Sequence, residues 1–597
     1  MRIFEATMAI KDHRTEPMQL TYFGIGVLQL LPKEKKRLLL DSKEGWFRTN
    51  FLPLIPANLV ERLYSEKKNV RPASYAIPHV ASAFFVHLTG LTETEFLNQL
   101  PWNLKYQFAI GIDQWTENVE FGPDTFKDLR ARIAKYNSKH PGEDIWDQIA
   151  HSIDMQMVSK MGLLTNRYNN TYQYGLRMDS LMIDMQATHR PRLDLVYSTI
   201  DFVIKYLKRH DIPIPDELQH FLEKGDHRNT VYIHGTAKEY RDAGLESKET
   251  PADSLDDKKR RDAITDTKLK KLLPEADVLR EYLEDLELEE TNEYIVLSRM
   301  LSEQTRRGED GSLIILDKKE ISATSLQSPY ETEATYRFKR QAEYGYVAST
   351  TELFNQQGDG IIIDRRVEPN SYTDQQFMKD FHEKHDPVLL VRDHDRAFLS
   401  VDAGFVSGEL NEKSNSLGYD VYCAGVHGVE PDTIFADFVM NSGKTEIIRC
   451  PSGHKPDKST MYGKVIRIRF ADKRCKLCEN KERCKATITG KNETKGSSYV
   501  DVSESKITAA TCVKMRHGEL GEEALEYINK RNAIEGLNAV LRTRYRIDDR
   551  NMPGLSYLRY SFYSIITCFN WNKYLSHCKN HNLVRDLEPY LTDRLLN

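Results

Sequence analysis

The chain has 597 residues, of which 40% are hydrophobic and 29% charged, with a net charge of −5 and a mean hydropathy of −0.58. This length exceeds a single core, so we expect about two to four domains. No apolar run approaches the roughly 18 residues that a membrane span needs, and the charged N-terminus lacks the apolar stretch of a signal peptide. We therefore expect a cytoplasmic protein without membrane contact, whose eight cysteines are thiols or metal ligands and not disulfides.

The N-terminal part of the chain is predicted to be helical. Short helical patterns run through residues 57–137, and Phe126 and Leu129 recur at helical spacing within one of them. A further helix is expected at 144–165. We therefore predict an N-terminal all-α domain at 1–165. Such a domain is suited to binding DNA, although periodicity alone does not establish a helix-turn-helix.

The pattern then changes to a strand at 174–187, which contains Asp179. Charged helical material is expected at 194–320, with an exposed linker at 249–262 that has little apolar content to bury. Four further strands and two closing helices are predicted, at 343–354, 359–369, 396–405 and 418–425, and at 521–544 and 555–575. Strands that are interrupted by a helical insertion and closed by helices predict a mixed α/β core.

Two aspartates have sequence neighbours that suit an active site. Asp402 ends an apolar strand, and Ala403-Gly404 leave room beside its carboxylate for a metal ion or a phosphate. Taken alone, an acid that closes a strand at a turn is the more ordinary explanation. Asp179 lies inside a strand, and Asp184 five residues later faces the opposite side. Only one of these two can join the same site as Asp402.

Glu535 is the third acid, on a predicted helix. One polar stripe of this helix is formed by Arg531, Glu535, Asn538 and Arg542. We interpret Glu535 as a metal-binding carboxylate between guanidiniums that grip DNA phosphates. The ordinary alternative is an exposed ion pair worth about 0.3–0.5 kcal/mol. If folding brings the three acids together, they can hold two divalent metal ions, the usual means of breaking and joining phosphodiester bonds.

The cysteines indicate a second site. Cys475 and Cys478 form a two-residue knuckle, Cys484 follows six positions later, and Cys450 lies 25 positions before the knuckle. Three or four thiolates at this spacing can hold Zn²⁺ tetrahedrally, with His454 as a spare ligand. A cluster of reduced thiols without a metal ion accounts for the same spacing equally well.

Two regions are locally basic. The stretch from Lys464 to Lys485 has nine Lys or Arg against three acids, and that from Lys530 to Arg550 has six against three. Local basic patches matter more for phosphate contact than the net charge does. For either patch alone, a solvated helix face is the simpler explanation.

Taken in order, these segments resemble the DDE transposases of bacterial insertion sequences. The resemblance is carried by FGPDTFKDLRARI, by LRMDSLMIDMQA around the first acid, by SPYETEATYRFKRQAEYGYVAST, by SVDAGFVSGELNEKSNSLGYDV around the second acid, by CPSGHKP with CKLCENKERC, and by KRNAIEGLNAVLRTRYRIDDRNMPGLSYLRY around the glutamate. Two positions depart from the pattern: Leu181 stands where relatives often have Thr, and Tyr527 lies one residue further from Arg531 than the related tyrosine signature expects.

The resemblance implies an RNase H-like core with Asp179, Asp402 and Glu535 as the metal-binding triad. It also implies a set of DNA contacts, namely Lys530, Arg531, Asn538, Arg542 and Arg544. The implied cofactor is Mg²⁺, which Mn²⁺ can replace, and the cysteine region would add a structural Zn²⁺. The implied reaction is cleavage and joining of double-stranded DNA at terminal inverted repeats, by a homodimer or larger homo-oligomer associated with the nucleoid.

The resemblance also divides the chain into functional parts. A helical domain that binds DNA ends (1–165) is followed by the first part of the RNase H-like core (170–205), a charged helical insertion with a linker (206–325), core strands (326–440), a Cys-rich basic insert (441–500) and C-terminal helices that complete the core (501–597). Two other functions stay open. One is a transposon-derived DNA-binding protein without catalysis, and the other is an RNase H-like nuclease that cleaves without joining.

Overall fold

The computed structural model describes most of the chain. The described residues are 10, 31–64, 75–112, 121–185, 191–222, 255–338, 342–384, 395–423, 430–470, 474–489, 497–548 and 553–583. Their fold is mixed α/β, as predicted from the sequence. Among these residues, no helix has the length and apolar character that crossing a membrane requires.

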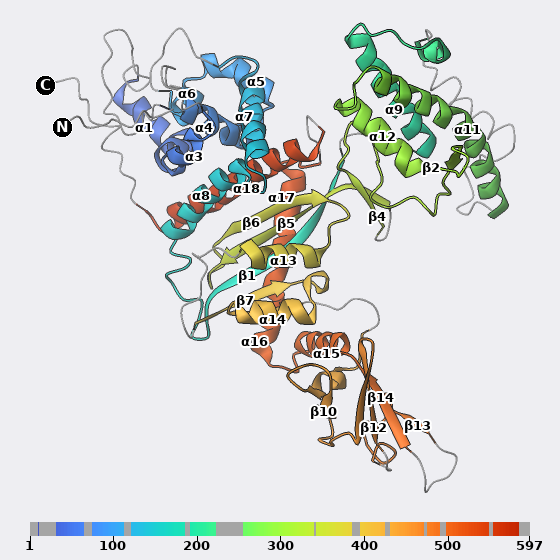
Figure 1. Cartoon of the computed structure of the whole chain (residues 1–597). Helices are drawn as coiled ribbons and strands as arrows, with labels where there is room; N and C mark the ends of the chain where they lie inside the picture. Colours follow the sequence, from blue (N-terminus) through green and yellow to red (C-terminus); the bar gives the residue numbers. More distant parts are fainter. Residues whose placement is uncertain are drawn as a thin grey trace, which may run out of the picture.

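A mixed sheet lies at the centre of the molecule (Figure 1). In spatial order its strands are β6 (Gly360–Pro369), β5 (Ala342–Phe354), β1 (Tyr172–Asp184), β7 (Arg396–Val401) and β8 (Tyr419–Cys423), and β4 (Thr335–Phe338) pairs with one end of β5. β5 runs antiparallel to β1 and β6, whereas β1, β7 and β8 are parallel. The five strands predicted from the sequence are therefore confirmed over their described residues, except that the third of the later four ends at Val401 and Ala403–Phe405 form a 3-10 turn. The predicted strand residues 186–187 and 424–425 lie outside the described residues.

The sheet strands are apolar in consecutive positions because helices cover both faces. Ile361 and Ile362 are both fully buried, and so are Phe398 and Leu399, which requires cover on both sides. α18 (Leu555–Asn580) lies along β6 and beside α8 (Ile145–Lys160). Further helices that add side chains to the same core are α13 (Asp374–Lys384), α14 (Gly408–Ser416) and α17 (Ala533–Thr543).

The described residues between 31 and 160 form helices and turns. These are α1 (Lys33–Asp41), α2 (Lys43–Trp46), η2 (Phe47–Phe51), η3 (Leu52–Leu54), α3 (Ala57–Glu61), α4 (Ala76–Thr89), α5 (Glu93–Gln99), η4 (Leu100–Trp102), α6 (Leu104–Ile110), α7 (Thr125–Lys139) and α8. They share one hydrophobic core with the sheet. Phe84 of α4 stacks on Trp146 of α8 with ring centroids 5.0 Å apart, and the Trp146 indole donates a hydrogen bond to Ser564 of α18 at 3.0 Å. α18 thus joins the N-terminal helices to the sheet.

A second hydrophobic core lies in the helical insertion, at the upper right of Figure 1. It is formed mainly by α9 (Arg192–Arg209), α11 (Leu255–Asp285) and α12 (Asn292–Gln304), with η5 (Asp216–Leu222) beside them. Ile200, Leu272 and Leu297 are buried there. α9 therefore packs with the insertion, although it follows β1 directly in the chain.

Two local predictions in this insertion are wrong. Residues 305–315 contain a hairpin of β2 (Thr305–Arg307) and β3 (Leu313–Ile315) and not a helix. The turn between them favours a hairpin, because Gly311 has a φ of 78° and Asp310 accepts hydrogen bonds from Ser312.

Residues 255–262 begin α11 instead of forming a loop, since this charged stretch has no glycine or proline to stop a helix. The remainder of the predicted linker, 249–254, lies outside the described residues.

The cysteine-bearing region forms a third unit beyond β8, at the lower end of Figure 1. Its main sheet has the order β11 (Lys458–Tyr462), β12 (Val465–Phe470), β14 (Ser497–Val502) and β13 (Thr487–Thr489), and it is accompanied by η9 (Thr433–Asp437), β9 (Val439–Met440), β10 (Ile447–Arg449) and α15 (Glu504–Arg516). Ile466, Ile468 and Val500 lie in its core. The chain then returns to the central sheet through α16 (Glu522–Asn529).

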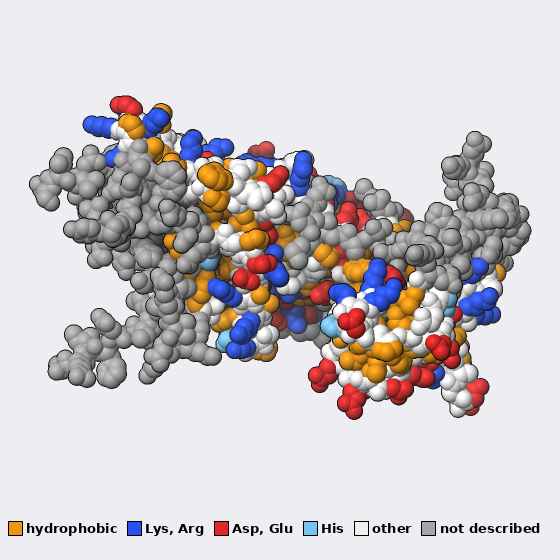
Figure 2. Space-filling view, turned by 90° about the horizontal axis from the view of Figure 1, so that it is seen from above, with side chains coloured by type: hydrophobic (Ala, Val, Ile, Leu, Met, Phe, Trp, Pro, Cys, Tyr) orange, Lys and Arg blue, Asp and Glu red, His pale blue; other side chains and the backbone are white. Residues whose placement is uncertain are grey.

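The surface of the helical insertion mixes acids with apolar side chains, as Figure 2 shows at its right. Its exposed apolar residues include Val278, Leu286, Ile295 and Ile314. Lys and Arg side chains lie on the same face (Figure 2), so its charge is mixed and not uniformly acidic.

Candidate active site on β1 and after β7

Asp179 lies within β1, and Asp402 directly follows the neighbouring parallel strand β7. β1 and β7 pair in register as far as Arg177 and Ser400, and the two aspartates follow two residues later on each chain segment. Residues at the same register of neighbouring strands point to the same side of a sheet. The Asp179 side chain is largely buried, whereas Asp402, which follows the end of β7, is half exposed.

One arginine connects both aspartates to Glu535. The Arg531 Nη2 atom lies 3.6 Å from Asp179 Oδ1 and 4.0 Å from Asp402 Oδ2. Its Nη1 atom lies 3.4 Å from Glu535 Oε1. The structure therefore brings together the three acids that the sequence singled out. Glu535 is 65% exposed, so its carboxylate faces solvent.

Side chains of the sheet hold the segment that carries this arginine. The Arg177 guanidinium of β1 donates to the carbonyl oxygen of Lys530 at 3.1 Å and to Glu352 at 2.7 Å. The Ser400 hydroxyl of β7 donates to the carbonyl oxygen of Tyr527 at 2.6 Å. Because both strands bind the backbone just before α17, the position of Arg531 over the two aspartates is fixed by the sheet.

Tyr527 has a packing role. Its ring is buried in an aromatic group with Phe398 and Tyr422, at centroid distances of 4.5 and 5.0 Å. Its hydroxyl accepts a hydrogen bond from Asn169 at 2.8 Å. Tyr527 therefore packs α16 against strands β7 and β8 of the sheet.

A fourth acid, Asp374, was not predicted; it lies against Gly404 and is close enough to Asp179 for its charge to raise the pKa of that residue. It is the first residue of α13. A methyl group on Gly404 would lie 2.2 Å from Asp374 Oδ2, so the room that the glycine leaves beside Asp402 is filled by this carboxylate. Its other oxygen, Oδ1, is buried without a hydrogen-bond partner. Asp374 could not be singled out from the sequence, because an acid in the first turn of a helix is ordinary.

The electrostatics of the site are set by an excess of acids. Burial raises the pKa of Asp179, the Arg531 charge lowers it, and the charges of Asp402 and Asp374 raise it again, with a net direction upward. One guanidinium thus contacts three carboxylates, and a fourth acid, Asp374, adds negative charge near Asp179. Excess negative charge with a buried, unpartnered oxygen fits a site for divalent cations, and carboxylate oxygens are the ligands that Mg²⁺ and Mn²⁺ prefer.

The five residues predicted to contact DNA fall into two groups. Arg531 and Asn538 bind the acids of the site, since the Asn538 amide donates to Asp179 Oδ2 at 3.3 Å. Lys530 pairs with Glu526 at 3.2 Å, Arg542 donates to the Met182 carbonyl oxygen at 2.8 Å, and Arg544 is exposed. The last three place positive charge along the segment that surrounds Glu535.

Asp184, the alternative to Asp179, lies at the exposed end of β1. Its backbone N–H donates to Asp548 at 3.3 Å. The alternation of side chains along β1 directs it to the face opposite Asp179. The geometry therefore favours Asp179 as the acid that accompanies Asp402.

The four predicted cysteine ligands surround a common hollow. Cys450, Cys475, Cys478 and Cys484 line it together with His454, and none of the four forms a disulfide. Burial raises the pKa of the Cys484 thiol to about 12, and the other three thiols contribute to the rise. Among the described residues, Asp359, His577 and His581 are the group whose metal-ligating atoms all lie within 4.8 Å of one another. The four cysteines do not form such a group. No three of these four sulfurs therefore lie within 4.8 Å of one another, whereas a spacing of about 3.8 Å is expected around one zinc ion.

Comparison with protein-family models, curated proteins and solved structures gave no match.

Proposed function

We propose that this chain is a DNA transposase of the DDE type, which cleaves and joins DNA strands at the site of Asp179, Asp402 and Glu535. One observation carries the proposal: a single guanidinium contacts three carboxylates that stand 223 and 133 positions apart in the chain (179 to 402, and 402 to 535). The acids converge from distant segments on one guanidinium, and the negative charge that this guanidinium leaves unneutralised favours the binding of divalent cations.

The sheet supports an RNase H-like assignment for the core. Its order is β6-β5-β1-β7-β8, and within these five strands β5 alone runs opposite to the others. The resemblance in the sequence implies this type of core, with its acids on the first and fourth strands and on a later helix.

Each acid and its neighbours would have a defined role. Asp179, Asp402 and Glu535 would hold Mg²⁺ or Mn²⁺, with Asp374 as a further carboxylate. Such ions, when bound, activate the attacking water or 3′-hydroxyl and stabilise the leaving oxygen. Arg531 holds the acids together against their mutual repulsion, and a guanidinium at this place is suited to binding a DNA phosphate.

The partner in this proposal is double-stranded DNA at the ends of the element and at its target, at the nucleoid. Lys530, Arg542 and Arg544 would bind the backbone near the site, and the helices within 1–165 would bind the element ends. We propose a homodimer or larger homo-oligomer, because strand transfer joins two ends to one target.

We also propose that the four cysteines hold a structural Zn²⁺. The support is their arrangement around one hollow and the mutual influence of their thiols on Cys484. A zinc ion would draw the sulfurs closer than they lie here and would stabilise the small β unit, which has a limited core of its own.

The proposed function is tested with purified protein, Mg²⁺ and a DNA fragment that bears the ends flanking the gene. We expect cleavage at the ends and joined product with a target plasmid. Asp402→Asn and Glu535→Gln should each lower the cleavage rate by at least about 100-fold, more than the loss of an indirect metal contact, while the affinity for end DNA is retained.

The matched control is Glu383→Gln on α13. Glu383 has the same 65% exposure as Glu535 and a similar i, i+4 ion pair, with Lys379 at 3.8 Å. Its replacement should leave cleavage unchanged. Full cleavage by Glu535→Gln would refute the assignment of the site. Cleavage without joined product would instead indicate a nuclease, and DNA binding without any cleavage would indicate a DNA-binding protein.

A further inference from the structure

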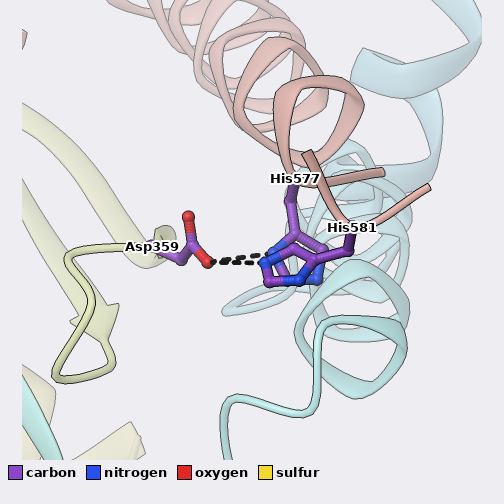
Figure 3. A group of neighbouring side chains, drawn as sticks. All are labelled: Asp359, His577 and His581. Atoms are coloured by element: carbon purple, nitrogen blue, oxygen red, sulfur yellow. Dashed lines mark hydrogen bonds and ion pairs between the residues drawn. The ribbon is translucent and has the colours of Figure 1, made fainter. Parts of the chain in front are cut away.

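A second group of metal-ligating side chains lies where the last helix meets the β5–β6 turn (Figure 3). Asp359 lies in the turn just before β6, and its backbone is held there by hydrogen bonds with Asn355. His577 lies in the last turn of α18, and His581 is the residue that caps the helix. The two histidines are four positions apart, so they lie on the same side of the helix.

Both imidazoles point at one oxygen of the carboxylate (Figure 3). His577 Nδ1 lies 2.9 Å from Asp359 Oδ2, and His581 Nε2 lies 3.8 Å from the same atom. All three ligating atoms lie within 4.8 Å of one another. Ligands on one tetrahedral zinc ion are about 3.3 Å apart, given metal–ligand distances near 2.0–2.1 Å. The two observed distances lie on either side of that value.

An ion pair at a helix C-terminus explains only part of this arrangement. A protonated His577 would bond Asp359 at 2.9 Å and would also interact favourably with the helix dipole. The second imidazole lies against the first, with ring centroids 4.2 Å apart, and its Nε2 atom is 3.8 Å from the carboxylate, which is too long for a hydrogen bond. The ring contact does not require this nitrogen to face the same oxygen, whereas shared ligation of one ion does.

We propose that Asp359, His577 and His581 form a binding site for a divalent transition-metal ion of the Zn²⁺ type. Two imidazoles and one carboxylate suit such an ion, whereas Mg²⁺ prefers sites made of oxygen ligands. His577 is nearly buried and His581 is 56% exposed, so the fourth position is open to water from the His581 side. This site is separate from the carboxylate site and does not depend on the proposed function.

The bound ion would clamp the end of α18 to the central sheet. The turn that carries Asp359 connects β5 to β6, and β5 pairs with β1, where Thr350 lies opposite Asp179. The ion would thereby join the C-terminal helix to the hairpin that supports the first acid strand. Its effect would be on stability, through binding to the folded chain alone.

The test uses the full chain and Zn²⁺ as the probe. Zinc bound per chain is counted after dialysis against a chelator-buffered Zn²⁺ solution, and thermal unfolding is followed with and without Zn²⁺. His577→Ala/His581→Ala should hold one zinc ion fewer than the unaltered chain and should lose part of its zinc-dependent stabilisation. Any zinc on the cysteine cluster is common to both proteins and cancels in the difference.

Two further variants keep the test decisive if the double variant does not fold. Asp359→Asn retains a hydrogen-bond acceptor for His577 but removes the charge, and His581→Ala removes an exposed ring. Each should lower the affinity for Zn²⁺ at this site by at least about tenfold. His140→Ala is the matched control, because His140 also caps a helix, α7, and its ring contacts the Tyr136 carbonyl oxygen at 2.9 Å. Equal zinc content and equal zinc-dependent stabilisation in all of these proteins would overturn the proposal and leave an ion pair only.

Discussion

Two clusters of acids gather around an arginine in this molecule, and their surroundings differ. Arg365 of β6 is 3% exposed and pairs with Asp154 and Asp147 of α8. Further cations face these acids, since Lys384 lies 3.0 Å from Asp147 and 3.3 Å from Asp364. Arg366 adds a third cation, 3.1 Å from Asp380. Three cations therefore face four acids in a largely buried cluster that joins α8 and α13 to the sheet.

The Arg531 cluster has the same number of acids and one cation. Two of its acids, Asp402 and Glu535, are about half or more exposed. A buried cluster whose charges nearly balance holds helices in place and needs nothing further. An unbalanced cluster that opens to solvent has the charge and access to bind cations. The comparison shows why proximity of acids to an arginine is not sufficient to identify a site: the deficit of positive charge is the distinguishing feature.

The largest expected difference between the clusters is in stability. Arg365→Met should lower the free energy of unfolding by about 3–5 kcal/mol, because it leaves buried carboxylates unpaired. Arg531→Met should cost much less, since two of its partners are solvated. Urea unfolding at pH 7, followed by tryptophan fluorescence, measures both. If both variants lost the same free energy of unfolding, the Arg531 cluster would stabilise the fold as the Arg365 cluster does.

The second difference is in the sign of an acid's contribution to stability. Burial raises the pKa of Asp147, but the charges of Lys384 and Arg365 outweigh burial and lower it to about 2. An acid whose pKa is lower in the folded chain stabilises the fold above its ordinary pKa, and this stabilisation is lost as the pH falls from about 4 towards 2. Asp147→Asn should therefore cost roughly 2 kcal/mol at pH 7.

Asp179 should behave in the opposite way. Its pKa is raised by burial, so ionisation lowers the stability of the fold as the pH rises through and above its ordinary pKa. Without added Mg²⁺, Asp179→Asn should leave stability at pH 7 unchanged or increase it, and this gain should vanish near pH 3. Urea unfolding at the two pH values measures it. A loss at pH 7 as large as that of Asp147→Asn would show that Asp179 is a structural acid.

A smaller effect is expected from the fourth acid. Asp374→Asn should lower Mg²⁺-dependent cleavage by at least about tenfold while end-DNA affinity is unchanged, as for other groups that support a metal site. Gly404→Ala should act in the same direction, because its methyl group would displace the Asp374 carboxylate. Glu383→Gln on the same helix again serves as the control. A full cleavage rate for both variants would exclude Asp374 from the site.

The strands and the three acids were predictable from the sequence because they have strong local signals. Apolar runs mark the strands, and the stripe of Arg531, Glu535 and Asn538 marks one helix face. Resemblance to a family then put the acids in one site. The structure changed the interpretation of Arg531 and Asn538, which bind the acids directly.

The residues that were missed depend on contacts between distant segments. Asp374 resembles any acid that begins a helix until Gly404 is seen beside it. Asp359 and His577 stand 218 residues apart, and neither has a neighbour in the chain that indicates a metal. The β2–β3 hairpin was missed for a local reason, because short strands within a long charged helical region have too few residues to show a period of two.

The central claim is that the acids around Arg531 bind a pair of divalent metal ions. Crystals of the protein soaked in Mn²⁺ and measured for anomalous scattering test it most directly. We predict two manganese peaks between Asp179, Asp402 and Glu535, about 3.5–4 Å apart, both absent from crystals of Asp402→Asn. Manganese peaks at other acids with none at these three, in crystals where Arg531 still contacts all of them, would contradict the claim.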